Sequence, residues 1–541
     1  MTSSYASRAT VMSTGGIVCS TSPQAASAGL RVLAEGGNAF DAAIATAAVE
    51  TVTVPAMCGL GGEMFVIMYQ ASTGKVIGLT STGQAPRAAT PELFRSKGYT
   101  HMPGNGPLAA SPPGEVAGYQ LINDTFGTMP LAKLLEPAIG YAEEGHPLSP
   151  RMGRLFAGGA ERLAQFPSSA KIFLKDGRPY AGGEVWANKD LARTLRRIAE
   201  GGAEEFYRGG IARDIAKAFS DAGGIIDEES LSNMSPETYE PLSTEYRGYA
   251  VMENRPPSQG MILLEMLNII EGYDMASLGH MSPESIHLMI EAKKLAFADR
   301  NAYLADPRVE SMPLEELLSK EHAAKRREQI DSKRASSNVP QAGLVAAGTD
   351  TSYFCVADGD GNVVSLIHSL YNAFGSGFVA EGTGMVFNNR QHGFRLEEGH
   401  PNTVAPGKRP MHTLNSFMVM KDGKPFIAAG TPGADFQVQG NTQVITGIVD
   451  YGLGPQEVVD APRWVSVPGS DPSSLDQPYA VQLEPRMPDS VAEELESLGH
   501  TVSWGQEGIS HGIFQLIQTD QESGVMMGAS DPRGDGHAGA I

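Results

Sequence analysis

The sequence contains little cysteine and no excess of basic residues. Its three cysteines, Cys19, Cys58 and Cys355, are scattered along the chain. Because they are odd in number and lack metal-ligand spacing, we expect buried free thiols in a reducing compartment and no disulfide framework. Lys and Arg together number 41 against 62 Asp and Glu, which gives a formal charge of −21. Such a chain lacks the basic face that sequence-independent nucleic-acid binding requires, and we do not expect it on an anionic membrane surface.

Long apolar segments are also absent. No run reaches the roughly 18–20 apolar residues of a membrane-spanning helix. The stretch from Met1 to Arg8 contains no apolar segment of the kind found in signal peptides. We therefore expect neither a membrane segment nor a targeting segment, and we predict a cytoplasmic protein. The length of 541 residues, with 41% hydrophobic residues and 63 glycines, is typical of a globular protein with many tight turns.

Helical and strand patterns alternate along the chain. Ser22 and Pro23 are typical of a helix start, and they predict a helix that ends near Glu35. The segments Met64 to Tyr69 and Lys75 to Thr80, separated by a turn, predict two paired strands. This alternation of elements, without a repeat at solenoid spacing, indicates a layered α/β fold.

Thr351 stands where a long polar segment gives way to an apolar strand. The preceding segment, Lys325 to Gly348, is rich in chain-breaking residues and predicts a loop or a processing site. The strands Ser352 to Asp358 and Val363 to Ser369 follow, joined by a Gly-Asp-Gly-Asn turn. A threonine in this position is either an ordinary strand or helix-cap residue or the nucleophile of a self-cleaving hydrolase. Its context alone supports both interpretations equally.

Three motifs that could bind a cofactor are better explained as turns or isolated residues. His392 and His400 have no further ligand at metal-site spacing. The loop 358–362 lacks the glutamate that completes a calcium loop. The glycine-rich corner 59–62 precedes a strand and lacks the Lys-Ser/Thr of a phosphate-binding loop. We therefore expect neither a metal nor another cofactor.

A set of short motifs runs through nearly the whole chain in a fixed order. They are Glu35–Ala43, Gly59–Gly62, Pro113–Gly118, Glu205–Gly209, Tyr246–Tyr249, Pro256–Ser258, Ala296–Arg300, Asp350–Thr351, Phe374–Gly377, Lys408–Pro410, Gly430–Gly433 and Gly528–Arg533. One such motif would be weak, but the ordered set is highly specific. On these motifs the chain resembles the gamma-glutamyltransferase family of N-terminal-nucleophile hydrolases.

The resemblance implies a fold and a way of making the active enzyme. It implies a four-layer αββα sandwich, synthesised as an inactive precursor. Cleavage between Asp350 and Thr351 would give a large subunit, residues 1–350, and a small subunit, residues 351–541. The two subunits would remain one intertwined fold, and the resemblance leaves open a dimer of processed heterodimers.

The resemblance also assigns catalytic roles. The Thr351 hydroxyl would attack the Asp350 carbonyl in the precursor, and cleavage would free the Thr351 α-amine, whose ordinary pKa is about 7.7–8.0. That amine can act as the base for the hydroxyl during turnover. Ser369 matches the hydroxyl residue that supports the nucleophile. Gly433 and Ala434 match paired glycines whose backbone N–H groups form the oxyanion hole, and a backbone donor survives the change to alanine where φ and ψ permit.

Several positions that contact substrate depart from the family pattern. The arginine that grips the donor's α-carboxylate is replaced by Thr82, and the aspartate that holds its α-ammonium is replaced by Gly393. Each lost charge-assisted contact is worth about 1.5–3 kcal/mol. A zwitterionic glutamyl head group is therefore disfavoured. The other altered positions, which we predict to contact substrate together with Thr82, are Tyr371, Arg390, His412 and Thr413.

Arg390 supplies a replacement cation, and the pattern around it resembles the intracellular branch of the family that includes oxamate amidohydrolase. We therefore predict an amidase for a small, carboxylate-bearing amide, whose carboxylate pairs with Arg390. The alternative for Arg390 is a structural ion pair. The alternatives for the protein are a gamma-glutamyltransferase or glutathione hydrolase that uses different anchors, and a catalytically inactive relic that binds ligands.

Overall fold

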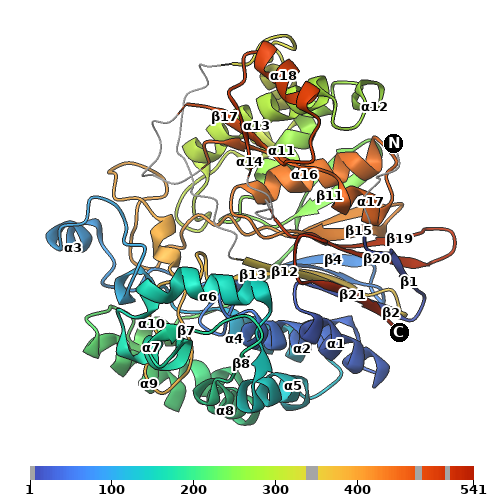
Figure 1. Ribbon diagram of the computed structural model, residues 1–541. Helices are drawn as coiled ribbons and strands as arrows, with labels where there is room; N and C mark the ends of the chain where they lie inside the picture. Colours follow the sequence, from blue (N-terminus) through green and yellow to red (C-terminus); the bar gives the residue numbers. More distant parts are fainter. Residues whose placement is uncertain (1–6, 337–350, 470–477, 506–511) are drawn as a thin grey trace.

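Two β-sheets stack face to face, and helices cover both outer surfaces (Figure 1). The computed structural model describes residues 7–336, 351–469, 478–505 and 512–541. The predicted four-layer αββα sandwich is confirmed. The predicted cleavage residue Asp350 lies outside the described residues.

Each sheet has seven strands and combines strands from both sides of residue 351. Sheet I has, in spatial order, β21 (His537–Ala540), β2 (Gly16–Ser20), β12 (Thr351–Asp358), β13 (Val363–Ser369), β3 (Glu63–Gln70), β4 (Lys75–Ser81) and β9 (Glu237–Tyr239). Sheet II has β1 (Val11–Ser13), β20 (Met526–Ser530), β19 (Gln515–Thr519), β15 (Lys424–Gly430), β14 (Phe417–Lys421), β11 (Tyr249–Glu253) and β10 (Leu242–Tyr246). The division into subunits 1–350 and 351–541 stays a prediction, but neither segment contains all the strands of sheet I or of sheet II.

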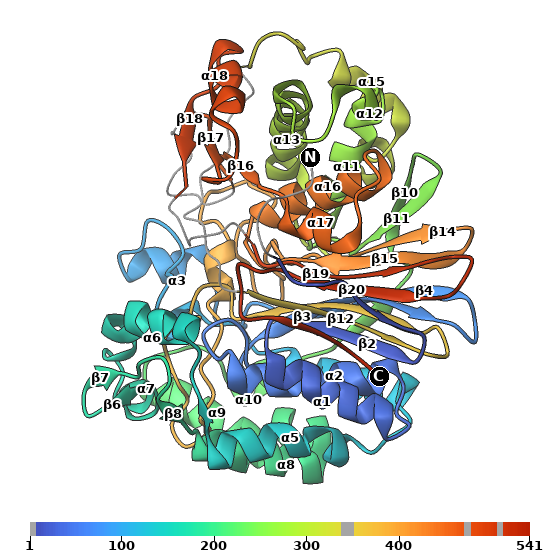
Figure 2. The same cartoon turned by 45° about the vertical axis from the view of Figure 1, so that its right-hand side comes forward.

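Helices from distant parts of the chain form the outer layers, as the turned view in Figure 2 shows. Sheet I is covered by α1 (Pro23–Ala34), α2 (Ala39–Thr53) and α4 (Glu115–Phe126), with α5 (Leu131–Glu144) and α8 (Lys189–Tyr207) outside them. Sheet II is covered by α11 (Gly260–Ile270), α16 (Phe436–Val449) and α17 (Pro455–Asp460), and α13 (Pro283–Tyr303) packs against α11. The remaining helices include α3 (Pro91–Ser96), α6 (Pro150–Leu163), α7 (Pro167–Phe173), α9 (Gly210–Asp221), α15 (Lys320–Arg327) and α18 (Asp489–Ser497).

Local sequence signals set the helix starts. The Ser22 hydroxyl accepts the Ala25 N–H and Pro23 occupies the first turn of α1, as predicted. Asn38 and Asp41 form a reciprocal capping box at the start of α2. Every residue of α2 is buried, so small side chains let this helix pack closely between sheet I and α5.

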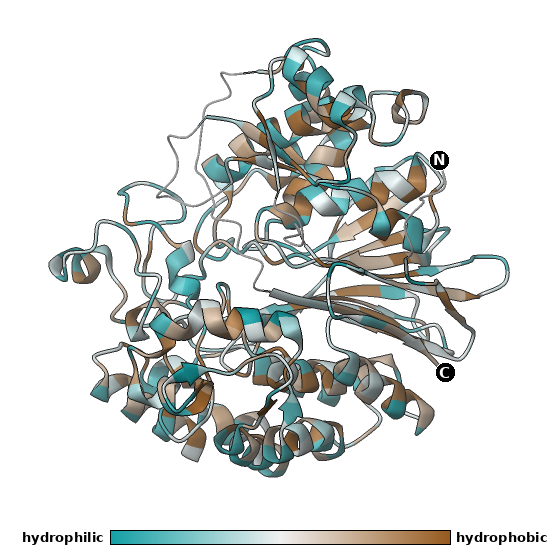
Figure 3. Ribbon diagram, viewed as in Figure 1, coloured by the Kyte–Doolittle hydropathy of each residue, from teal (hydrophilic) through white to brown (hydrophobic). Residues whose placement is uncertain are grey.

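The strands of sheet I alternate between two apolar environments. Tyr353, Cys355 and Ile367 belong to the core between the sheets, whereas Phe354 and Leu366 belong to the core shared with the helices. This period of two is the ordinary consequence of strand geometry. Figure 3 shows apolar residues in the strands and on the helices packed against them.

The predicted loop from Lys325 to Gly348 requires a correction at its start. Lys325, Arg326 and Arg327 are the last residues of helix α15, because the basic side chains favour the carboxyl end of a helix. Residues 337–348 of this segment lie outside the described residues. Within the part of the chain that the structure describes, no helix is both long and apolar enough to cross a membrane.

We predict that Gly61 tolerates no side chain. A Cβ added there would lie 2.2 Å from the Val386 carbonyl oxygen, because the segment around Phe387 bridges to Gly61. Gly61→Ala is expected to lower the free energy of unfolding by about 1–3 kcal/mol in urea titrations. The matched control is Gly140→Ala inside α5, where a Cβ meets no atom within 4 Å and is expected to stabilise the helix by about 0.5–1 kcal/mol. Equal effects of the two changes would contradict this reading of the packing.

Candidate active site

Thr351 begins β12 and faces Ser369, the last residue of β13. The two are direct partners in the antiparallel ladder, and Thr351 Oγ1 lies 3.0 Å from Ser369 Oγ. The Ser369 hydroxyl also accepts the Tyr371 N–H at 2.8 Å. Thr351 is only 4% exposed. The two predicted hydroxyl residues are therefore brought together at a protected strand end.

Tyr371 has a strained backbone that places its ring against Arg390. Its φ is +84°, and the left-handed region costs a residue with a Cβ about 1–3 kcal/mol. The guanidinium carbon of Arg390 lies 4.3 Å from the centroid of the Tyr371 ring, a cation–π contact. Two of the predicted substrate-binding residues thus lie next to the hydroxyl pair.

Arg390 is fully buried and is used on only one edge. Its Nε donates to Glu63 Oε1, whereas Nη1 and Nη2 have no hydrogen-bond partner among the described residues. The sequence left open whether Arg390 forms a structural ion pair or binds a ligand, and the geometry allows both. A buried donor without an acceptor is unfavourable until an acceptor arrives.

Glu63 is a residue of this site that the sequence analysis missed, because the glycine motif was read only as far as Gly62. Glu63 begins β3 and is the ladder partner of Ser369, so the side chains of Thr351, Ser369 and Glu63 share one face of sheet I. Burial raises the pKa of Glu63 to about 7, although Arg390 acts to lower it. Its Oε2 has no partner among the described residues. The available signal was an acidic residue at the start of an otherwise apolar strand.

His412 lies beside this ion pair as a neutral ring. Its Nδ1 is 3.6 Å from Glu63 Oε1, and its edge packs on Phe65. Burial lowers the pKa of His412 well below its ordinary value, and Arg390 and Arg409 lower it further. Both ring nitrogens lack a partner among the described residues, so the ring offers one donor and one acceptor.

Thr82 and Thr413, the remaining predicted substrate-binding residues, occupy different surroundings. Ser81 pairs with Met64 across the sheet, so Thr82 lies next to Glu63, and its buried Oγ1 has no partner among the described residues. Thr413 is 4% exposed, and its carbonyl accepts the Gln259 side-chain amide at 2.7 Å. Thr82 therefore adds a hydroxyl beside the Glu63–Arg390 pair, and Thr413 is part of the neighbouring wall.

Gly433 and Ala434 form the turn between β15 and α16. Their φ values are +133° and +49°, so Ala434 adopts a conformation that normally favours glycine. Their carbonyls accept the N–H groups of Phe436 and Gln437. Neither amide N–H of the pair has an acceptor within the described part of the chain. The oxyanion-hole role of the pair stays a prediction.

Gln259 and Arg300 support this turn, and the sequence analysis assigned them no role. The Gln259 side-chain amide donates to the carbonyls of Ala434, at 3.0 Å, and Thr413, at 2.7 Å. Its oxygen accepts Arg300 Nη1 at 2.6 Å, and Arg300 also pairs with Asp435. Arg300 is fully buried, so the hydrogen bonds of Gln259 and Arg300 lie in a low-dielectric setting, where such bonds are strong.

A buried ionic network lies on the opposite face of the same strand ends. His368 contacts Glu115 through Nδ1 and Glu50 through Nε2, both at 2.7 Å. Ser352 donates to the same Glu50 carboxylate at 2.6 Å. Because Ser352 and His368 are the chain neighbours of Thr351 and Ser369, the network fixes both strand ends from the side of α2 and α4.

Three clusters among the described residues bring possible metal-ligand atoms within 4.8 Å of one another. In each, the histidine already has a hydrogen-bond partner in the protein, and this bonding accounts for the arrangement. We therefore assign no metal site. The clusters are Glu50–Cys58–His368, His287–Glu291–His500 and Glu265–Asp299–His322.

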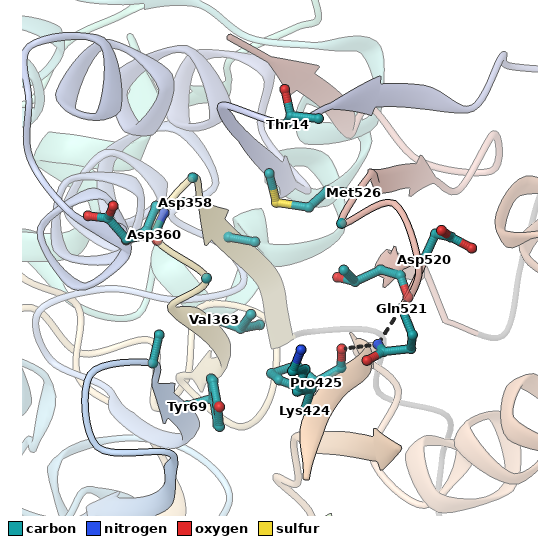
Figure 4. A pocket seen from close by; sticks show the side chains of 16 residues that line it. Thr14, Tyr69, Asp358, Asp360, Val363, Lys424, Pro425, Asp520, Gln521 and Met526 are labelled. Carbon is teal, nitrogen blue, oxygen red and sulfur yellow. Dashed lines mark hydrogen bonds between the residues drawn. The ribbon is translucent and has the colours of Figure 1, made fainter. Parts of the chain in front are cut away.

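A cavity of about 400 Å³ opens at the other end of the sandwich, where β12 ends (Figure 4). Asp358 on its wall is bonded to Asn362, and Gln521 donates to Pro425 and Thr519. These groups are thus satisfied within the protein. The cavity lies about 23 Å along β12 from Thr351, at about 3.3 Å per residue, and we assign it no part in the chemistry.

The four-layer fold, with a threonine at the start of a central strand, is that of the N-terminal-nucleophile hydrolases. Residues 25–541 match the model of the gamma-glutamyltranspeptidase family. The chain belongs to this family and is an amide hydrolase and acyl transferase of its type.

Relatives cover the chain almost completely. It is 38% identical to the glutathione hydrolase-like YwrD proenzyme of Bacillus subtilis, over 98% of this chain and 99% of the relative. It is 33% identical to the oxamate amidohydrolase proenzyme of Klebsiella pneumoniae, over 97% of this chain and 98% of the relative. The crystal structure of a cephalosporin acylase from Bacillus halodurans superposes with a TM-score of 0.91 at 38% identity, covering 100% of this chain and 98% of the other.

We predict a pH-dependent contribution of His368 to stability. Burial lowers its pKa, but Cys58 and Glu115 outweigh that effect, and the pKa lies well above its ordinary value. A raised folded-state pKa gives stability that is complete below the unfolded-state value of about 6.5 and is lost as pH rises through the folded-state pKa. His368→Gln is therefore expected to cost about 3–5 kcal/mol near pH 6, and less in alkaline solution.

Urea unfolding at a series of pH values measures this effect. His101→Gln, at an exposed histidine, serves as the control and is expected to change stability by less than about 0.5 kcal/mol at every pH. A cost of His368→Gln that stays constant from pH 6 to pH 9 would show that the imidazolium charge is not what stabilises the network.

Proposed function

We propose that this protein is an autoprocessing N-terminal-threonine amidohydrolase for a small amide that carries a carboxylate. The observation that carries the proposal is the free edge of Arg390, a fully buried guanidinium that pairs with Glu63, the ladder partner of Ser369. The proenzyme relatives support the autoprocessing. The oxamate amidohydrolase relative supports this kind of substrate.

Autoprocessing uses the Thr351 hydroxyl. Its Oγ1 attacks the carbonyl carbon of Asp350, the peptide C–N bond breaks, and the α-amine of Thr351 is released as an ester forms. Water then hydrolyses the ester, which gives the Asp350 carboxylate and restores the hydroxyl. We further propose that the subunits stay together in the cytoplasm, where the three buried free thiols remain reduced.

Turnover repeats the same chemistry on a substrate. The free α-amine of Thr351, with an ordinary pKa of about 7.7–8.0, removes the hydroxyl proton and returns it to the leaving amine. The Ser369 hydroxyl donates to Oγ1 and stabilises its developing charge. The backbone N–H groups of Gly433 and Ala434 receive the oxyanion of the tetrahedral intermediate. Water hydrolyses the resulting acyl-enzyme.

Substrate selection follows from the unpaired groups of the site. A carboxylate accepts two parallel hydrogen bonds from a guanidinium edge, and Arg390 presents Nη1 and Nη2 without partners among the described residues. The Tyr371 ring makes a cation–π contact with the guanidinium. His412 and Thr82 offer further polar contacts. The ion pair with Glu63 uses only Nε and leaves this edge available.

We predict that Thr351 is required for processing. Thr351→Ala is expected to remain a single chain of 57.3 kDa on a denaturing gel, because it lacks the attacking hydroxyl. The natural protein is expected to give two bands, the smaller beginning at Thr351 by N-terminal sequencing. Thr351→Ser keeps the hydroxyl and is expected to be cleaved more slowly. Cleavage of Thr351→Ala before residue 351 would exclude this mechanism.

A substrate panel tests the proposed specificity. We expect ammonia release from oxamate or succinamate to exceed that from the neutral propionamide, and to exceed p-nitroaniline release from gamma-glutamyl-p-nitroanilide. Arg390→Ala is expected to raise KM for the carboxylated amides by about 10- to 150-fold, the equivalent of about 1.5–3 kcal/mol. The value for propionamide is expected to stay unchanged.

Arg390→Lys is the companion variant, since it keeps a cation for Glu63 but loses the paired Nη1 and Nη2 donors. It is expected to fold normally and to show an intermediate KM. Preferred turnover of the gamma-glutamyl compound would favour the alternative of a gamma-glutamyltransferase or glutathione hydrolase. Absence of turnover with every compound in a processed protein would favour an inactive relic.

A further inference from the structure

The Glu63 side chain lies on the same face of sheet I as those of Thr351 and Ser369, although no sequence motif included it. Thr351, Ser369 and Glu63 are successive ladder partners on three adjacent strands. At about 4.8 Å per strand, the Cα atoms of Thr351 and Glu63 are about 10 Å apart. A small amide that reacts with Thr351 and binds Arg390 must therefore lie next to the Glu63 carboxyl group.

A substrate carboxylate that binds next to ionised Glu63 adds a second negative charge to this buried site. The titratable groups that face Glu63 are Arg390 from the segment after Asn389, and Arg409 and His412 from the segment before β14; Glu115 of α4 acts on it from the other face of the sheet. His412 is neutral, because burial lowers its pKa. With Glu63 ionised, the Arg390–Glu63 pair has no net charge. With Glu63 protonated, the pair becomes a net cation with a free guanidinium edge.

A bound carboxylate would meet Glu63 in a fully buried setting. Two carboxylates brought together away from water repel each other, and this repulsion raises the pKa of one of them. The free Oε2 of Glu63 can hold a proton and donate it to the incoming carboxylate.

We infer that Glu63 is a specificity-determining residue, and that a carboxylate-bearing amide binds with uptake of one proton by Glu63. The proton comes from solvent, no covalent bond changes, and the bound state contains one carboxylic acid, one guanidinium and one substrate carboxylate. This inference rests on the proposed carboxylate site at Arg390. It adds a selection rule, because a substrate with an ammonium group would instead require ionised Glu63 and would take up no proton.

The pH dependence of KM for a carboxylated amide separates Glu63 from the amine base. Below about pH 7, Glu63 is already protonated in the free enzyme, so KM is expected to be constant. Above that pH the proton must be taken up, and KM is expected to rise about tenfold per unit between pH 7 and pH 9. The α-amine of Thr351 acts in the opposite sense on kcat, which rises as the amine loses its proton.

Glu63→Gln is the test, because glutamine imitates the protonated acid and still presents an oxygen to Arg390. For oxamate and succinamate its KM is expected to be independent of pH and about 100-fold below that of the natural protein at pH 9. Glu265→Gln is the matched control, since Glu265 is also fully buried and burial raises its pKa to about 8, but it lies in α11. It is expected to keep the natural pH profile.

The profile of the unaltered enzyme provides a second measurement that does not depend on folding of a variant. A KM that is flat from pH 6 to pH 9, or that falls with pH, would overturn the role of Glu63. Arg390→Ala could still raise KM for carboxylated amides selectively in that case, and the proposed function would stand. If Arg390→Ala has no selective effect, the proposed function itself fails.

Discussion

The register of three antiparallel strands is the constraint on which the rest of this site depends. Thr351, Ser369 and Glu63 are consecutive ladder partners, so their side chains share one face of sheet I. Their neighbours, Ser352 and His368, point to the other face and enter the buried network with the glutamates of α2 and α4. A slip of one residue would exchange these two sets. The ionic network therefore stabilises the same register that brings Thr351, Ser369 and Glu63 onto one face.

The site keeps polar groups buried without partners. Glu63 Oε2, two nitrogens of Arg390 and both nitrogens of His412 have none among the described residues. Each such group lowers stability by about 1–3 kcal/mol, and Tyr371 adds backbone strain. The surrounding layers offset these costs, because α2 and the strands between Thr351 and Ser369 are buried throughout. A dry interior also strengthens the interactions between the charges of this site.

Sequence patterns predicted the elements better than the contacts between them. The cap of α1 and the β12–β13 hairpin depend on nearby residues, and the structure agrees with the predictions there. The motifs were sufficient to predict the αββα sandwich. Glu63 and Gln259 were missed because their partners, Arg390 and Ala434, lie 327 and 175 residues away. No local pattern reports such a pairing. Glu63 and Gln259 also lie one residue beyond the motifs Gly59–Gly62 and Pro256–Ser258.

Ala434 shows how a position that departs from a family pattern can still be held in the backbone conformation of a glycine. Its φ of +49° would favour glycine, and a methyl group there costs about 1–3 kcal/mol of strain. Gln259 holds the Ala434 carbonyl, and Arg300 holds Gln259 through a buried charge-assisted bond that resists relaxation. The strained turn is thus specified by groups that contact the Ala434 carbonyl. A glycine would adopt this backbone conformation without strain, whereas in this chain hydrogen bonds from neighbouring side chains hold the alanine in it.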